Sequence, residues 1–79
     1  MASIKVKYQD KQQVFEVEDK PVVLKYLMYL FEQRMNIPYY EEIDFSIDGE
    51  LVFSGKKSEL DSFVAFKLDD NKNYELKYL

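Results

Sequence analysis

Residues 22–35 read VVLKYLMYLFEQRM, a run without glycine or proline. At 3.6 residues per turn, this run is long enough for a helix of about three to four turns. Pro21 suits the first turn of a helix, where its missing N–H has no partner to lose, and Asp19 is assigned as the N-cap. The helix should end before Ile37-Pro38, because a residue that precedes proline is pushed out of helical geometry.

Alternating sequence before this helix predicts a hairpin. Residues 4–8 alternate apolar and charged side chains, the polar residues 9–12 form a turn, and residues 15–18 resume the alternation. A period of two residues is typical of a half-buried strand. The solvent-facing side of this hairpin is expected to carry opposite charges that face each other across the two strands: Lys5, Lys7, Glu16 and Glu18.

A second hairpin is predicted after the helix. Residues 43–47 alternate again, with Ile43, Phe45 and Ile47 on the side that faces the core. Asp48-Gly49 is a strong signal for a two-residue hairpin turn. The return strand is expected at residues 50–53, and residues 54–57 are expected to form a loop.

The last part of the chain predicts a short helical turn and one more strand. Ser58-Glu59-Leu60-Asp61 has the spacing of a helix N-terminus, which would place Leu60, Phe63 and Val64 on one helical turn. Residues 69–73 form a cluster of turn-forming side chains, and residues 74–78 alternate as a final strand.

The order of elements predicts an α+β fold of the β-grasp type. Strand, strand, helix, strand, strand, short helix and strand give a mixed sheet of four to five strands packed on one main helix. The 79 residues make a single domain over residues 1–79. Local pattern leaves the order of the strands within the sheet open.

The amino-acid composition and the net charge argue against several classes of function. The chain has no His and no Cys, so it lacks the side chain that titrates near neutral pH and the thiol nucleophile. We therefore predict no catalytic residues, no cofactor and no metal site, and interpret the oxygen-rich residues 69–73 as a turn. A net charge of −4 disfavours nucleic acid as a partner, and no apolar run is long enough for membrane insertion.

The predicted helix is apolar around most of its circumference. Centred on Val23, Leu27 and Leu30, the apolar arc is roughly 260° wide, against about 100° or more for an ordinary surface helix. The core needs only part of this arc, and the remaining apolar surface has two explanations. It is a docking surface for a protein partner or a second copy. Otherwise it is covered by later residues of the chain: Phe63, Val64, Phe66 and Leu68. The candidate protein-binding residues, which include two loop tyrosines after Pro38, are Val22, Tyr26, Met28, Tyr29, Met35, Tyr39 and Tyr40.

Several stretches resemble ubiquitin-like proteins. Residues 14–18 resemble the second strand of ubiquitin, Ile37-Pro38 with the residues that follow resembles its helix-to-strand link, and residues 45–49 fall at its third strand and tight turn. The chain ends at Tyr78-Leu79 without a di-glycine, so it is not expected to be a conjugated modifier. The positions that match ubiquitin's apolar recognition patch are polar: Gln9, Ser46 and Lys77.

A narrower resemblance is to the bacterial YukD/EsaB-like family. It rests on Pro21-Val22, on residues 51–55 (LVFSG) and on residues 76–79 (LKYL). This chain departs from that family by a shorter first hairpin and by extra residues between Leu60 and Tyr74. The resemblance implies a non-enzymatic cytoplasmic accessory protein of a type VII secretion system, whose partners are proteins such as secretion-machinery components, with homo-oligomers as a further form.

The alternative is a ubiquitin-like or PB1-like interaction module of a larger scaffold protein. PB1 domains are β-grasp folds that pair a basic strand with an acidic motif. Lys5 and Lys7 would supply the basic side, and Asp48-Gly49-Glu50 resembles a shortened acidic loop.

Overall fold

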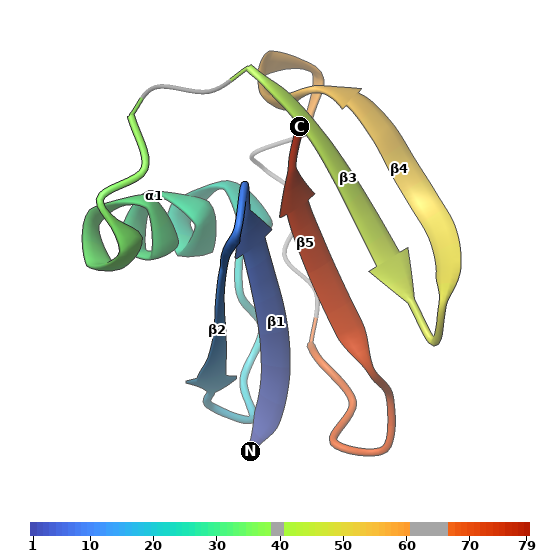
Figure 1. Cartoon of the computed structure of the whole chain (residues 1–79). Helices are drawn as coiled ribbons and strands as arrows, with labels where there is room; N and C mark the ends of the chain where they lie inside the picture. The colour runs from blue at the N-terminus through green and yellow to red at the C-terminus, as the bar shows by residue number, and fades with distance from the viewer. Residues whose placement is uncertain (39–40, 61–66) are drawn as a thin grey trace.

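The computed structural model describes residues 1–38, 41–60 and 67–79. Five strands, one α-helix and one 3₁₀ turn follow one another along this part of the chain (Figure 1). They are β1 (Ala2–Tyr8), β2 (Lys11–Val17), α1 (Leu24–Met35), β3 (Glu42–Ile47), β4 (Glu50–Lys56), η1 (Lys57–Glu59) and β5 (Tyr74–Tyr78).

All five strands belong to one mixed sheet in the order β2-β1-β5-β3-β4. The central pair, β1 and β5, is parallel, and the other three pairs are antiparallel. The helix α1 packs against one face of this sheet (Figure 1). This is the predicted α+β arrangement of the β-grasp fold, and the structure supplies the strand order that local pattern left open.

Both hairpins use two-residue turns. Asp48 and Gly49 have φ angles of 52° and 80°, as a type I′ turn requires, so the second turn is confirmed. The first turn was predicted at residues 9–12, but Tyr8 already pairs with Lys11 and only Gln9 and Asp10 lie between the strands. Gln9 takes the positive φ of 54° that this tight turn needs.

The helix starts later than predicted and ends where predicted. Val23 is the N-cap, with extended φ and ψ of −98° and 119°, and no side chain caps the first turn. The assignment of Asp19 as N-cap is therefore wrong, because Val22 forms a β-bridge and β-branched residues favour extended backbone. At the other end, Asn36 adopts the left-handed conformation at φ 54° that commonly terminates helices.

The return strand β4 is longer than predicted. Residues 54–57 were expected as a loop, yet Ser54 and Gly55 continue the ladder opposite Asp44 and Ile43. The Ser54 hydroxyl donates to Asp44 Oδ1 at 2.6 Å, which holds this end of β4 in register. The short helical turn η1 spans Lys57–Glu59, and Leu60 follows it with extended φ and ψ of −68° and 133°. The prediction that Leu60 lies on the turn is therefore wrong, because the turn ends where the Leu60 N–H donates to the Lys57 carbonyl oxygen at 3.1 Å. The predicted places of Phe63, Val64 and Phe66 lie outside the described residues.

The core lies between α1 and the sheet. Leu24, Met28, Phe31 and Met35 form the buried stripe of the helix. Their partners come from alternate positions of the strands, such as Ile4, Ile43 and Leu76, each with 0% exposure. The Phe15 and Phe31 rings lie 4.6 Å apart between centroids. Leu68 is also buried, so one of the four residues proposed as cover contributes to the core.

The described part of the chain contains no helix that is long and apolar enough to span a membrane. The predicted strand at residues 74–78 is confirmed at both ends as β5, and Tyr74, Leu76 and Tyr78 point into the core.

Candidate protein-binding surface

The helix exposes an aromatic face on the side away from the core. The side chains of Tyr26 and Tyr29 are 73% and 65% exposed, and Leu30 beside them is 41% exposed. Residues at spacings of three and four are neighbours on a helix, so these three side chains form one continuous patch. We call the patch formed by Lys25, Tyr26, Tyr29 and Leu30 the tyrosine face.

Two of the predicted binding residues belong to the core instead. Met28 is 0% exposed and Met35 is 7% exposed, so neither is available to a partner. The sheet lies against the side of α1 that carries Leu24 and Phe31, about a quarter of a turn from the expected centre at Val23 and Leu27. Met28 and Met35 share that side, which is why they are covered.

The other predicted binding residues do not belong to the tyrosine face. Val22 is half-buried and packs against the core cluster just before α1 begins. Tyr39 and Tyr40 lie outside the described residues. The structure therefore brings together Tyr26 and Tyr29 from the predicted set and adds Leu30, which the sequence pattern had assigned to the core side.

A shallow apolar depression borders the tyrosine face. Lys25, Tyr26, Tyr29 and Lys57 line a hollow of about 480 Å³ at the junction of α1 and η1. A second depression shares Tyr29 and Lys57 and continues toward Ile37 at the end of the helix. The two hollows share Tyr29 and Lys57, so they lie side by side along this part of α1.

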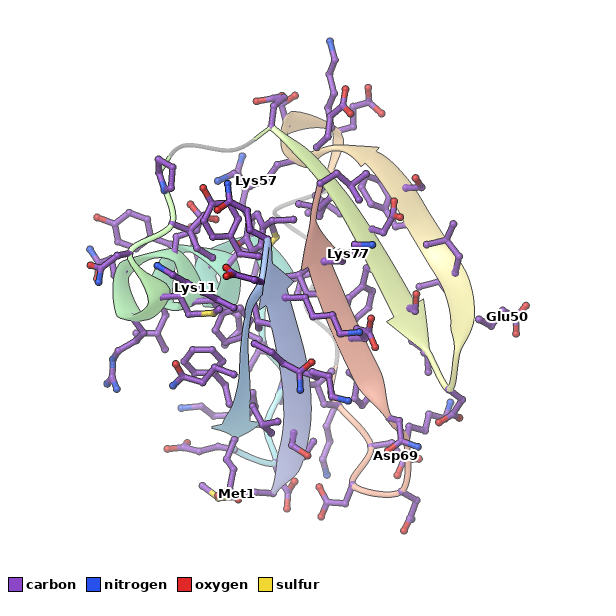
Figure 2. The ribbon with its side chains drawn as sticks, viewed as in Figure 1. Met1, Lys11, Glu50, Lys57, Asp69 and Lys77 are labelled. Atoms are coloured by element: carbon purple, nitrogen blue, oxygen red, sulfur yellow. The ribbon has the colours of Figure 1, made fainter. Side chains whose placement is uncertain are left out.

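An ion pair between Lys57 and Glu32 lies beside these hollows. Lys57 Nζ lies 3.0 Å from both carboxylate oxygens of Glu32, and the two side chains are only 15% and 12% exposed. The Tyr78 hydroxyl donates to Glu32 Oε2 at 2.8 Å. This network joins η1, α1 and β5 one helical turn from Tyr29. Figure 2 shows Lys57 beside the helix.

Burial is the main cause that raises the pKa of Tyr78 above its usual value, and the hydrogen bond to the Glu32 carboxylate adds to it. A phenol that loses its proton here would place a second negative charge against Glu32 in a site with little water. Tyr78 is therefore a neutral hydrogen-bond donor, and its role in the network is structural.

The surroundings of the tyrosine face are basic, although the whole chain carries −4. Lys25 lies within the face, and Arg34 lies further along the same helix. Neither has an ion pair among residues 1–38, 41–60 and 67–79. Glu32, the acidic residue of α1, is already neutralised by Lys57. The face thus combines aromatic surface with unpaired positive charge.

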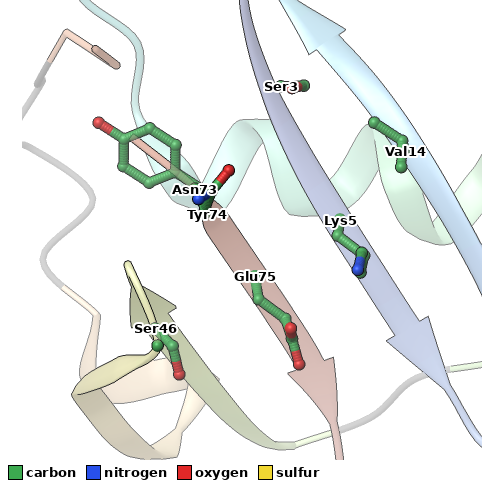
Figure 3. Close-up of a pocket in the computed structure, with 8 residues that line it drawn as sticks. Ser3, Lys5, Val14, Ser46, Asn73, Tyr74 and Glu75 are labelled. Carbon is green, nitrogen blue, oxygen red and sulfur yellow. The ribbon is translucent and has the colours of Figure 1, made fainter. Parts of the chain in front are cut away.

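The outer face of the sheet is polar and mixed in charge. The predicted cross-strand set does not form, because Lys5 pairs with Val14 and Lys7 with Gln12 in the actual register. Lys7 Nζ instead lies 3.3 Å from Glu75 Oε1 on β5. Figure 3 shows a hollow on this face, lined by side chains that include Ser3, Lys5 and Glu75. The PB1-like alternative would need Lys7, which already has this partner.

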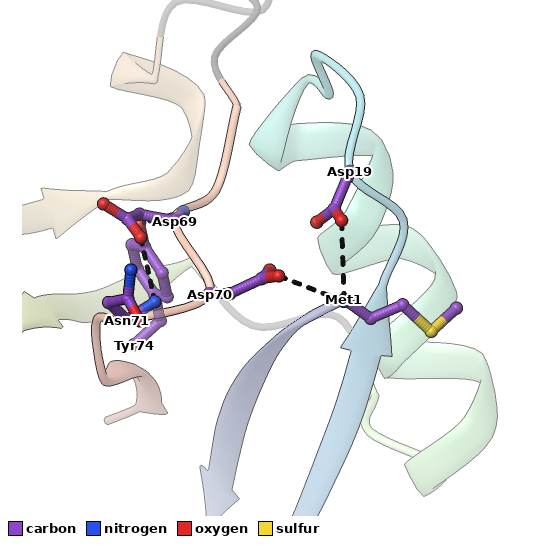
Figure 4. Close-up of polar contacts among 6 residues, drawn as sticks. All are labelled: Met1, Asp19, Asp69, Asp70, Asn71 and Tyr74. Carbon is purple, nitrogen blue, oxygen red and sulfur yellow. Dashed lines mark hydrogen bonds and ion pairs between the residues drawn. The ribbon is translucent and has the colours of Figure 1, made fainter.

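The turn predicted at residues 69–73 is confirmed. Asp69 Oδ1 accepts a hydrogen bond from the Asn71 N–H at 2.8 Å, and Asp48 Oδ1 accepts one from Asn73. The Met1 amino group lies 3.3 Å from Asp70 and 3.6 Å from Asp19 (Figure 4). Asp19 therefore contributes to a surface ion pair rather than to the helix cap.

The described residues contain no cluster of three or more acidic, His or Cys side chains placed to hold a metal ion. The β-grasp fold is established by the strand order and by the helix on one face of the sheet. Comparison of the chain with family models, with curated proteins and with solved structures finds no match.

Proposed function

We propose that this chain is a non-enzymatic, cytoplasmic protein-binding domain that contacts its partner through the tyrosine face. The observation that carries the proposal is the exposure of two neighbouring tyrosines, Tyr26 at 73% and Tyr29 at 65%, on an ordered helix. Exposed tyrosines are favoured at interfaces because they bring a large contact area at low cost in conformational entropy.

The chemistry of the face indicates an acidic partner segment with apolar side chains. Lys25 and Arg34 attract carboxylates, while the tyrosine rings and the hollow beside Lys57 accept apolar groups. Complementary charge speeds association and excludes basic competitors more than it adds to affinity. The non-enzymatic part of the proposal rests on the absence of His and Cys from the sequence.

The proposed setting is a type VII secretion system, in which the chain is an accessory or regulatory component. This part rests on the resemblance to YukD/EsaB-like proteins in residues 51–55 and 76–79. A gene that lies beside a secretion ATPase or a small helical secreted substrate would support it. A gene far from both in every genome that carries it would contradict it.

The binding proposal is tested by affinity capture from the native cytoplasm with Tyr29→Glu and Tyr26→Glu variants. A buried carboxylate is costly at an apolar contact, so both variants should lose the specific interactors that the wild-type chain retains. Val14→Glu is the matched control, because Val14 is 54% exposed and lies on the outer face of the sheet with Lys5. Interactors that survive in both tyrosine variants would contradict the proposal.

A further inference from the structure

The strand β4 forms one edge of the sheet. Among the described residues it is hydrogen-bonded to β3 alone, and β2 forms the opposite edge. Figure 1 shows β4 at the rim, with β3 as its neighbour in the sheet. Seven residues at about 3.4 Å each make an edge of roughly 24 Å. An edge of this kind presents unpaired N–H and C=O groups that can accept another strand.

The middle of this edge carries exposed apolar side chains. Leu51 is 52% exposed and Val52 is 53% exposed. Leu51 pairs with Ser46 and Phe53 with Phe45, so Val52 is the additional residue of a β-bulge. Natural edge strands avoid lateral pairing by means of charged residues, proline or a β-bulge that twists the edge. The strand β4 has the bulge at Val52 but no proline. Here the charged residues stand only at the two ends of the strand.

Those two charges have opposite signs. Glu50 is the first residue of β4 and Lys56 is the last. Both are exposed, and neither has an ion pair in the part of the chain that the structure describes. Figure 2 shows Glu50 projecting away from the sheet at the rim.

We propose that β4 pairs antiparallel with β4 of a second copy of this chain, which joins two sheets into one continuous sheet. A two-fold axis through Phe53 brings Glu50 near the partner's Lys56 at the two ends of the paired strands, with the bulge at Val52 between Glu50 and the axis. Symmetry then forms the Glu50–Lys56 pair twice. A two-fold axis is the commonest symmetry of homo-oligomers.

The charges select this arrangement over the alternatives. Parallel pairing of the same strands would place Glu50 opposite the partner's Glu50, and like charges directly opposite each other are destabilising. The other edge strand, β2, does not have charges that complement those of a second copy of itself. Full-length antiparallel pairing there would place Lys11 opposite the partner's Val17, and no ion pair would form. The proposal uses the rim of the sheet, so it is independent of the proposed use of the tyrosine face.

The contact is small, and the dimer is therefore weak. A single pair of seven-residue strands buries less than the roughly 1,200 Å² of a standard interface. We expect a dissociation constant of about 0.1–1 mM, which corresponds to a dimer that forms at high local concentration, as on a shared assembly.

The experiment measures self-association by sedimentation velocity and by NMR shifts from about 10 µM to about 1 mM. Four variants are compared with the wild-type chain: Glu50→Lys, Lys56→Glu, the double exchange Glu50→Lys/Lys56→Glu, and Lys11→Glu on the β2 edge as control. Each single exchange at β4 turns both attractive pairs into repulsive ones and should weaken dimerisation about tenfold. The double exchange restores opposite charges across the axis and should recover wild-type association.

Net charge alone predicts a different result. Glu50→Lys changes the net charge of the chain from −4 to −2, because one negative charge is lost and one positive charge is gained. That variant would associate more strongly if general repulsion were the cause, but strand pairing predicts weaker association.

A chain that stays monomeric over the whole concentration range would overturn the proposal. So would association that the single exchanges leave unchanged, that the double exchange fails to restore, or that Lys11→Glu weakens as much as Lys56→Glu does. Thermal unfolding of each variant verifies that the fold is intact.

Discussion

Both sides of α1 carry large side chains with extensive apolar surface, yet their surroundings are opposite. One side carries Met28 and Phe31, which are 0% and 1% exposed, and the other carries Tyr26 and Tyr29, which are 73% and 65% exposed. An isolated helix with this sequence would offer the sheet apolar residues on nearly every side. The comparison shows that apolar content alone does not decide which side becomes core.

The two sides differ in the polar groups of their side chains. In addition, Glu32 between them has specific partners on other elements. A tyrosine needs a hydrogen-bond partner for its hydroxyl when it is buried, whereas methionine and phenylalanine have no such need. Glu32, between the two sides, is fixed by Lys57 and Tyr78. This three-residue contact favours the observed rotation of the helix about its own axis against the sheet.

Truncation of the buried side should have the largest effect on stability. Phe31→Ala leaves a cavity beside Phe15 and should cost about 3–5 kcal/mol of unfolding free energy, a large share of the total for a small domain. Tyr26→Ala on the exposed side should change it by less than about 0.5 kcal/mol. Urea unfolding followed by circular dichroism measures both. Similar costs for the two variants would contradict the assignment of the two sides.

Removal of the Glu32 carboxylate, which pairs with Lys57, should have the second-largest effect on stability. Glu32→Ala leaves the Lys57 ammonium and the Tyr78 hydroxyl without this partner and should cost about 2–3 kcal/mol. Glu32→Gln keeps a hydrogen-bond acceptor for Tyr78 and should cost less. Urea unfolding of both variants checks which one loses more unfolding free energy. A Glu32→Ala variant as stable as the wild type would show that the contact with Lys57 does not stabilise the packing of the helix.

Loss of the Tyr78 hydroxyl should cost about 1 kcal/mol near neutral pH. The pKa of Tyr78 is raised in the folded state, so the unfolded chain ionises first as the pH rises. The stability that the protonated phenol contributes is therefore fully present below about pH 10 and is lost above it. The difference in unfolding free energy between wild type and Tyr78→Phe should be constant up to about pH 9 and should shrink as the pH rises past about 10.

The matched control for that series is Tyr26→Phe, because the side chain of Tyr26 is exposed and, among the described residues, takes no part in the network of Glu32, Lys57 and Tyr78. A wild-type advantage over Tyr78→Phe that stays constant with pH would contradict the assigned role of the phenol.

Substitution on the exposed side should affect stability least and binding most. Tyr29→Glu should shift the unfolding free energy by less than about 0.5 kcal/mol, since the side chain makes few core contacts. The same variant is expected to lose the partner. Thermal melting and affinity capture on one preparation separate the two effects, and a melting temperature that falls together with binding would show that Tyr29 supports the fold.

Sequence could predict the elements that depend on neighbouring residues. Asp48-Gly49 determined the second turn because both positions need positive φ, and Pro38 determined the end of the helix. The bounds of β5 followed from strict alternation between Tyr74 and Tyr78. In each of these places the deciding interactions lie within a few residues of one another.

The features that sequence could not predict depend on distant residues. Leu30 was expected toward the core but is 41% exposed, because a helix that is apolar on most sides has no strong directional signal. Lys57 was assigned to a loop, and its contact with Glu32 spans 25 residues of chain. The start of β4 was correct but its end was not, since the pairing of Ser54 with Asp44 carries the strand past the predicted stop.

The position of β5 has a consequence for the synthesis of the chain. This strand comes last in the sequence, yet it lies in the middle of the sheet between β1 and β3. Until residues 74–78 leave the ribosome, the two hairpins have no strand to join them, and both would expose apolar edges. The domain is therefore expected to complete its fold only once residues 74–78 have been synthesised, and until then its exposed apolar surface favours aggregation.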